Sequence, residues 1–123
     1  MAYLLRFLRR GGPALTGLRH FARTQRGDLL TYVLVLGTQV TLGLWLRLPA
    51  RDLALLWLAT SLVLFAEVFN TAVESLVDRV GPEHHPLSGL AKDLAAGAVF
   101  LAIFMALVCA LLLLLPPLAG RLA

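Results

Sequence analysis

Four polar side chains interrupt a long apolar stretch at regular intervals. They are Glu67, Asn70, Glu74 and Asp78. Their spacing of i, i+3, i+7 and i+11 places them on one stripe of a helix, since each residue turns it by about 100°. Carboxylates within a membrane need a counter-charge or a cation. Carboxylate and amide oxygens suit Mg²⁺, which completes its coordination shell with waters and phosphate oxygens. The stripe therefore predicts a binding wall for a metal-bound phosphate compound.

The segment after this stripe supplies further polar groups. It contains Glu83 and His85, and a Lys92-Asp93 pair precedes the next apolar stretch. A lysine beside carboxylates and a metal suits an anionic phosphate chain. The adjacent His84 and His85 do not have the spacing of a zinc pair on a helix. These residues predict phosphoryl transfer at a membrane interface, without the glycine-rich loop of the Walker motif.

Two other interpretations stay open at this point. In the first, Glu67 and Glu74 only form ion pairs with Arg79 and Lys92 in an assembled helix bundle. In the second, the chain is a small ion- or proton-coupled transporter subunit in which Glu67 carries the proton. A transporter is expected to have a polar path on both sides of such a residue, and the remainder of this helix face offers only Thr60 and Ser61.

Composition indicates the elements that must position these groups. The chain has 123 residues, of which 59% are hydrophobic and 15% charged, whereas a soluble domain has roughly 25% charged residues. Apolar segments at 29–48, 53–77 and 94–115 are long enough to cross a bilayer, and lipid requires them to be helical. We therefore expect an all-α membrane protein with three transmembrane helices in a single domain over 1–123, the third ending at Pro116-Pro117.

Residues 1–28 form a basic arm with six arginines among apolar residues. This pattern predicts an amphipathic helix at the membrane surface, broken near Gly11-Gly12-Pro13. Eight Lys and Arg residues fall on the side of the arm and of the 78–93 loop, and three on the other. The arm, the loop and the site should thus be cytoplasmic in a multi-pass protein of the inner (plasma) membrane. The net charge of +4 reflects this orientation, and we expect no nucleic-acid partner.

From the stripe onward the chain resembles the small integral-membrane diacylglycerol kinase family of bacteria, which also contains the undecaprenol kinases. The resemblance joins the intramembrane Glu-x-x-Asn-x-x-x-Glu pattern to the Lys-Asp pair at a fixed distance. A weaker similarity extends it across the N-terminal arm. The residues that carry it are Glu67, Asn70, Thr71, Ala72, Glu74, Asp78, the run His84-His85-Pro86-Leu87, and the run from Ala91 to Val99.

The resemblance implies a homotrimer that transfers the γ-phosphate of MgATP to the hydroxyl of a lipid alcohol at the cytoplasmic interface. Glu67 would be the catalytic base and would contact the lipid together with Ala96. Glu74 and Gln25 would hold Mg²⁺, and Asn70 and Asp78 would support them. The residues that would contact ATP are Arg6, Gln25, Glu74, Glu83, His85, Lys92 and Asp93.

The chain departs from the family pattern at Gln25, where that pattern has a metal-binding glutamate. An amide oxygen without charge should bind the metal less strongly, unless Asp28, three residues later, substitutes for it. A weakly active or repurposed member of the family is the alternative. Similarity at Asn70-Thr71-Ala72 and at residues 84–87 favours undecaprenol as the substrate, with diacylglycerol close behind.

Overall fold

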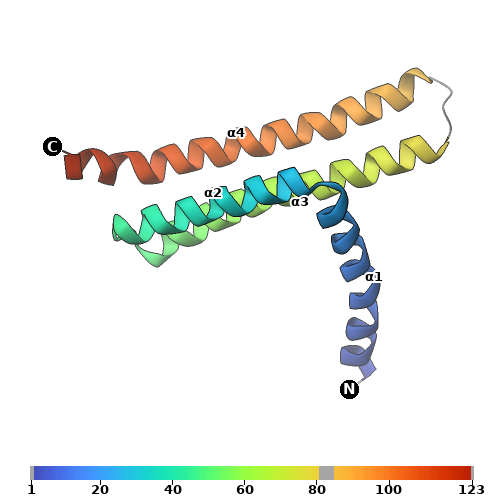
Figure 1. The fold of residues 1–123 in the computed structure, drawn as a ribbon, viewed down its shortest axis with the longest axis horizontal. Coiled ribbons are helices and arrows are strands. Elements are labelled where there is room, and N and C mark those ends of the chain that lie inside the picture. Colours follow the sequence, from blue (N-terminus) through green and yellow to red (C-terminus); the bar gives the residue numbers. More distant parts are fainter. Residues whose placement is uncertain (1, 81–84, 123) are drawn as a thin grey trace.

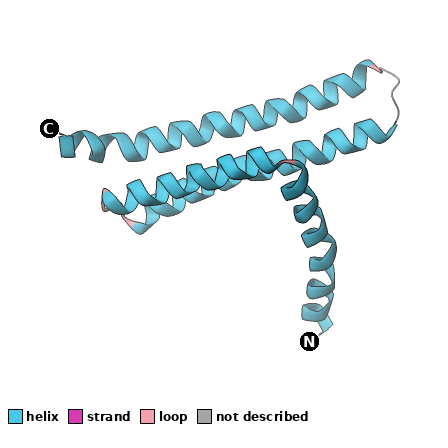
Figure 2. Cartoon of the chain, viewed as in Figure 1, coloured by secondary structure: helices cyan, strands magenta, loops and turns pink. Residues whose placement is uncertain are grey.

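The structure is a computed structural model that describes the backbone of residues 2–80 and 85–122, and the side chains of 11–80 and 85–122. Within these ranges the chain consists of helices joined by short connections, without a strand (Figure 2). Figure 1 shows α2, α3 and α4 running alongside one another, with α1 projecting away from them. This confirms the predicted all-α architecture. The helices are α1 (Ala2–Thr24), α2 (Arg26–Trp45), α3 (Ala50–Val80) and α4 (Pro86–Leu122).

Helices α2, α3 and α4 are each long and apolar enough to cross a membrane, with 20, 31 and 37 residues. A helix of 20 residues spans about 30 Å, which matches the hydrocarbon core of a bilayer. Large apolar side chains such as Phe100, Leu112 and Trp57 are mostly exposed on these helices. Lipid tails solvate such surfaces as well as a protein interior does. The chain is therefore a membrane protein with three spanning helices among its described residues.

The interior of the bundle is small because most apolar side chains face outward. Leu56 on α3 is 2% exposed, and Val99 and Ala102 on α4 are also buried. At the end of α2, a Cβ atom on Gly43 would lie 2.4 Å from Leu53 Cδ2. The absence of a side chain at Gly43 thus allows α2 to approach the beginning of α3 closely.

Two hydrogen bonds between side chains connect α2 to α3. Tyr32 Oη and Ser61 Oγ are 3.1 Å apart, and Thr60 Oγ1 donates to Gln39 Oε1 at 2.6 Å. Since hydrocarbon offers no competing water, such bonds help to select one register between two membrane helices. They hold α2 at a defined rotation against α3.

One predicted helix break and one predicted helix end are wrong. Helix α1 continues through Gly11-Gly12-Pro13, and α4 continues through Pro116 and Pro117 to Leu122. A proline removes its own N–H donor, and the carbonyl it frees near a membrane surface can bond to water. At the end of α4, the Arg121 guanidinium lies 4.9 Å from the centre of the Trp45 ring. This cation–π contact anchors the last turn of α4 to the end of α2.

Two predicted boundaries between the helices are shifted in the structure. The surface helix ends at Thr24, so Asp28 lies in the first turn of the membrane helix α2 and not in the arm. Residues 78–93 are not one loop, because α3 continues to Val80 and α4 begins at Pro86, where a proline needs no backbone donor. Lys92 and Asp93 therefore lie on the second turn of α4. The predicted nucleotide contact Glu83 lies outside the described residues.

Candidate active site

The polar stripe on α3 contains a directly bonded pair. Asn70 Nδ2 donates to Glu74 Oε1 at 3.1 Å, one helical turn away. The other amide atom, Asn70 Oδ1, is buried and accepts no hydrogen bond from any described residue. A buried oxygen without a donor is unfavourable and uncommon, so each instance requires an explanation. This oxygen belongs to the amide that bonds to Glu74, and a cation bound by both side chains would satisfy it.

These two residues fit a magnesium ion that is carried by phosphate. Glu74 offers a carboxylate and Asn70 a carbonyl oxygen, the hard ligands that Mg²⁺ prefers. Within residues 11–80 and 85–122, no three His, Cys, Asp or Glu side chains lie close enough together to enclose a metal. Mg²⁺ in phosphate-transfer sites needs only one or two carboxylates, because waters and substrate phosphates complete its shell. The donor set thus suits a substrate-bound ion better than a permanently caged one.

An ion pair connects α4 to α3 near their shared connection. Lys92 Nζ donates to Asp78 Oδ1 at 2.5 Å, and the two side chains are 40% and 68% exposed. Exposed pairs of this kind are exchangeable, since water and salt compete for both charges. The pair places a mobile positive charge one turn beyond Glu74 on the stripe. Lys92 can exchange Asp78 for an anionic ligand at this end of the bundle.

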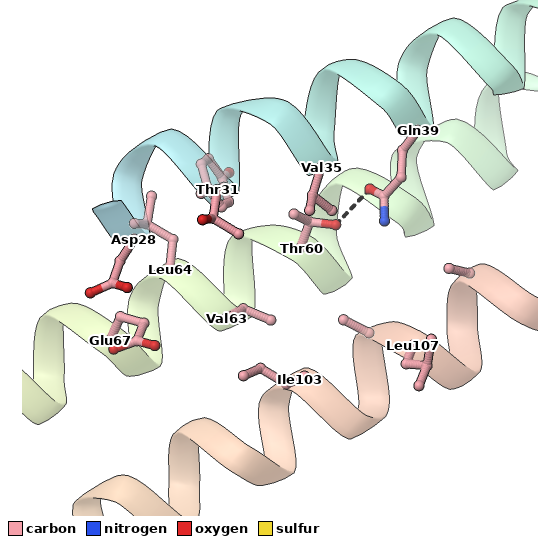
Figure 3. A pocket seen from close by; sticks show the side chains of 13 residues that line it. Asp28, Thr31, Val35, Gln39, Thr60, Val63, Leu64, Glu67, Ile103 and Leu107 are labelled. Atoms are coloured by element: carbon pink, nitrogen blue, oxygen red, sulfur yellow. Dashed lines mark hydrogen bonds between the residues drawn. The ribbon is translucent and has the colours of Figure 1, made fainter. Parts of the chain in front are cut away.

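A cavity of about 510 Å³ lies between α2, α3 and α4, within the usual size range of ligand pockets. Glu67 and Asp28 lie at one end of it, and Figure 3 shows their carboxylates facing each other from α3 and α2. Gln39 and Thr60 lie deeper along the same cavity. The cavity thus combines acidic groups at its end with an apolar interior. The apolar side chains that line it are Val35, Val63, Leu64, Ile103, Ala106, Leu107 and Ala110.

This cavity was not predicted from the sequence. The residues that could have indicated it are Gln39 and Thr60, because polar side chains are rarely placed within membrane segments without a function. Thr60 was noted only as part of an insufficient polar path. The partner of Thr60 depends on how α2 is rotated against α3, which neither segment reveals separately.

The remaining predicted site residues lie in different parts of the structure. Asp28 lines the cavity with Glu67, whereas Glu74 does not line it, so Asp28 is grouped with the proposed base. Gln25 precedes α2, and its side chain forms no hydrogen bond with any described residue. Ala96 and Asp93 are exposed on α4.

Of the predicted nucleotide contacts His85 and Arg6, the structure describes the side chain of His85 only. His85 Nδ1 accepts a hydrogen bond from Leu87 N at 3.3 Å at the beginning of α4. The side chain of Arg6 lies outside the described residues. The roles of these residues stay predictions.

Comparison with known proteins gives a consistent result. A family model described as prokaryotic diacylglycerol kinase matches residues 12–114. The chain is 42% identical to the diacylglycerol kinase of Escherichia coli (strain K12) over 69 residues, which are 56% of this chain and 57% of that protein. It is 31% identical to the undecaprenol kinase of Bacillus subtilis (strain 168) over 115 residues, 94% of this chain and 93% of that protein.

A further relative is the diacylglycerol kinase of Pseudomonas aeruginosa (strain PAO1). It is 36% identical over 102 residues, which cover 81% of this chain and 80% of that protein. The matched part of the E. coli protein is a little over half of its length, whereas the matches to the Bacillus and Pseudomonas proteins cover most of both chains. Because the family model covers α2, α3 and most of α4, the chain belongs to the prokaryotic diacylglycerol kinase family.

Proposed function

We propose that this chain is a lipid kinase that transfers the γ-phosphate of MgATP to the hydroxyl of a lipid alcohol, diacylglycerol or undecaprenol. The observation that carries the proposal is the position of Glu67 at the end of an apolar cavity between membrane helices. The Asn70–Glu74 and Lys92–Asp78 pairs follow it toward the α3–α4 connection. The names of the matched relatives, diacylglycerol kinase and undecaprenol kinase, support the same reaction class.

Glu67 is the proposed general base. A lipid with its hydrocarbon chain in the cavity would present its hydroxyl at the Glu67 end, where α3 holds the carboxylate half-buried. Glu67 would accept the hydroxyl proton while the lipid oxygen bonds to the γ-phosphorus and ADP leaves. General base catalysis requires a carboxylate within hydrogen-bond reach of that proton. Asp28 lies beside this step, and Ala96 is proposed as a further lipid contact.

Glu74 and Asn70 are the proposed metal-binding residues, since both carry free oxygens on the stripe. When bound, Mg²⁺ supplies charge neutralisation at the transferred phosphoryl group. Lys92 would add positive charge at the phosphates after releasing Asp78, and Asp93 lies next to it on α4. Gln25 would contribute a neutral oxygen in place of a carboxylate, with correspondingly weaker binding.

The proposed setting is the cytoplasmic face of the inner membrane, which the distribution of Lys and Arg supports. We also propose a homotrimer, by resemblance to the family. The exposed apolar side chains of α2 and α4 would then face either lipid or a neighbouring subunit. Arg6 and His85 would contact the nucleotide from the arm and from the beginning of α4.

The experiment is phosphorylation of either lipid by the detergent-solubilised chain with radiolabelled ATP and magnesium. Glu67→Gln is expected to reduce turnover by a factor of about 100 or more, the usual contribution of a general base. Asp52→Asn is the matched control, because it neutralises a carboxylate in the first turn of the same helix, at its other end. Absence of label in both lipids would overturn the proposal. Undiminished turnover in Glu67→Gln would exclude its role as base.

A further inference from the structure

Gln39 is a polar side chain buried inside the bundle. It is 9% exposed and lines the cavity from the second half of α2. Its Oε1 atom accepts the hydrogen bond from Thr60 at 2.6 Å. None of the described residues accepts a hydrogen bond from its Nε2 atom, and Figure 3 shows that nitrogen directed into the space between the helices.

This amide nitrogen would be left without a partner if a purely hydrocarbon ligand filled the cavity. Its Nε2 atom faces a cavity lined mostly by aliphatic side chains, with Asp28 and Glu67 at one end. A polar group that leaves water without gaining a partner is destabilising. A hydrogen-bond acceptor supplied by a ligand in the cavity would remove this cost.

The neighbours of Gln39 hold its amide in this orientation. Because Thr60 occupies the oxygen, the nitrogen is left as the group that faces the cavity. The adjacent Tyr32–Ser61 bond keeps α2 and α3 from rotating relative to each other. The donor is therefore preorganised, and a ligand that binds to it loses little additional side-chain entropy.

We propose that Gln39 is a specificity-determining residue that binds a second oxygen atom of the lipid and so favours acylated glycerols over polyprenols. This inference rests on the proposed lipid kinase activity and deepens it. A polyprenol has a hydrocarbon chain without an acceptor oxygen, whereas a diacylglycerol carries ester carbonyls beyond its free hydroxyl. The preference is the opposite of the one that the local sequence similarity favours.

The distance along α3 between Glu67 and Thr60, the partner of Gln39, suits a diacylglycerol. Thr60 precedes Glu67 by seven residues, which is about 10 Å along a helix axis. About six covalent bonds separate the hydroxyl oxygen of a 1,2-diacylglycerol from its farther carbonyl oxygen, and a hydrogen bond of about 2.8 Å at each end adds to this reach. One molecule could therefore contact Glu67 with its hydroxyl and Gln39 with a carbonyl.

The test compares a 1,2-diacylglycerol with a 1,2-dialkylglycerol of equal chain length, which lacks only the carbonyls, and with undecaprenol. Gln39→Leu removes the amide and keeps a similar volume, and Thr60→Val removes the hydroxyl that orients it. Thr41→Val is the matched control, since its exposed hydroxyl donates only to Gly37 O at 2.8 Å on its own helix. The readouts are kcat/KM for each lipid and the rise in melting temperature that each lipid causes.

The intact chain is expected to prefer the ester over the ether roughly threefold to tenfold, the difference that one uncharged hydrogen bond produces. Gln39→Leu should bring this ratio to about one, Thr60→Val should lower it, and Thr41→Val should leave it unchanged. A ratio of one in the intact chain, a ratio unaffected by Gln39→Leu, or a preference for undecaprenol would overturn the inference while leaving the kinase proposal intact.

Failure of the proposed function would be recognised separately. If no lipid is phosphorylated, the kinase proposal fails, and the melting temperatures alone decide the role of Gln39. An ester-specific rise that disappears in Gln39→Leu would support the role. Equal rises with ester and ether would overturn it.

Discussion

Replacing Asn70 by alanine tests whether the buried amide and Glu74 act together on a metal. The substitution removes the 3.1 Å hydrogen bond from Asn70 Nδ2 to Glu74 Oε1 and the adjacent Oδ1 oxygen. Glu74 would then lose the group that orients its carboxylate. If the pair binds magnesium, the affinity for the metal should fall more than any other property of the protein.

The structure sets the expected size of the effect. Removing a residue that orients a metal ligand typically costs a factor of 10–100 in metal affinity. The lost hydrogen bond to a carboxylate contributes about 1.5–3 kcal/mol to folding, but the orphaned oxygen that disappears with it costs about 1–3 kcal/mol. These two contributions have similar size and opposite sign. Stability without magnesium should therefore change little in Asn70→Ala.

The assay measures turnover against free magnesium at constant ATP, together with the melting temperature in the absence of metal. We expect the half-saturating magnesium concentration to rise about 10- to 100-fold, with a nearly unchanged melting temperature. Ser75→Ala is the matched control, because Ser75 is exposed and its hydroxyl donates only to Thr71 O at 2.8 Å. A lower maximal rate at an unchanged magnesium requirement would contradict this prediction, since Asn70 would then act elsewhere than on the metal.

Two further predictions concern the metal ligands and the helix packing. Gln25→Glu should lower the magnesium requirement severalfold, because carboxylates bind Mg²⁺ more strongly than amides do. Asp28→Asn should leave that requirement unchanged, since Asp28 lines the cavity with Glu67 and Glu74 does not, and a raised requirement would show that Asp28 substitutes for the missing glutamate. Gly43→Ala should lower the melting temperature modestly, because the Leu53 side chain must shift to make room for the added Cβ. Gly37→Ala, where no atom lies within 4 Å of the added Cβ, should not lower the melting temperature in detergent, and equal losses in the two variants would contradict this explanation.

The expectations that held depend on local properties of the chain. Hydropathy over about 20 residues identified the three spanning helices, because lipid admits only segments whose backbone bonds are satisfied internally. Helical periodicity placed Asn70 and Glu74 on one face, and the structure joins them by a hydrogen bond. The motif around these residues was also sufficient to indicate the family, which the family model over residues 12–114 confirms.

The errors arose at glycine and proline residues whose effect on the helix is compensated by their surroundings. Glycine and proline predicted a break in α1 and an end of α4, yet both helices continue through them. A lost backbone bond is tolerated where water can replace it, and at the end of α4 the contact between Arg121 and Trp45 adds support. These compensations involve solvent or a distant residue, so a local pattern does not contain them.

Composition and periodicity along the chain were sufficient to predict a membrane-spanning helical bundle with an acidic stripe on its second spanning helix. The folded bundle was needed to show that Asp28 faces Glu67, that Lys92 pairs with Asp78, and that Gln39 turns its amide into a shared cavity. Each of these relations joins two helices. Their relative rotation and register follow from packing and from hydrogen bonds between helices, which periodicity within one segment does not specify.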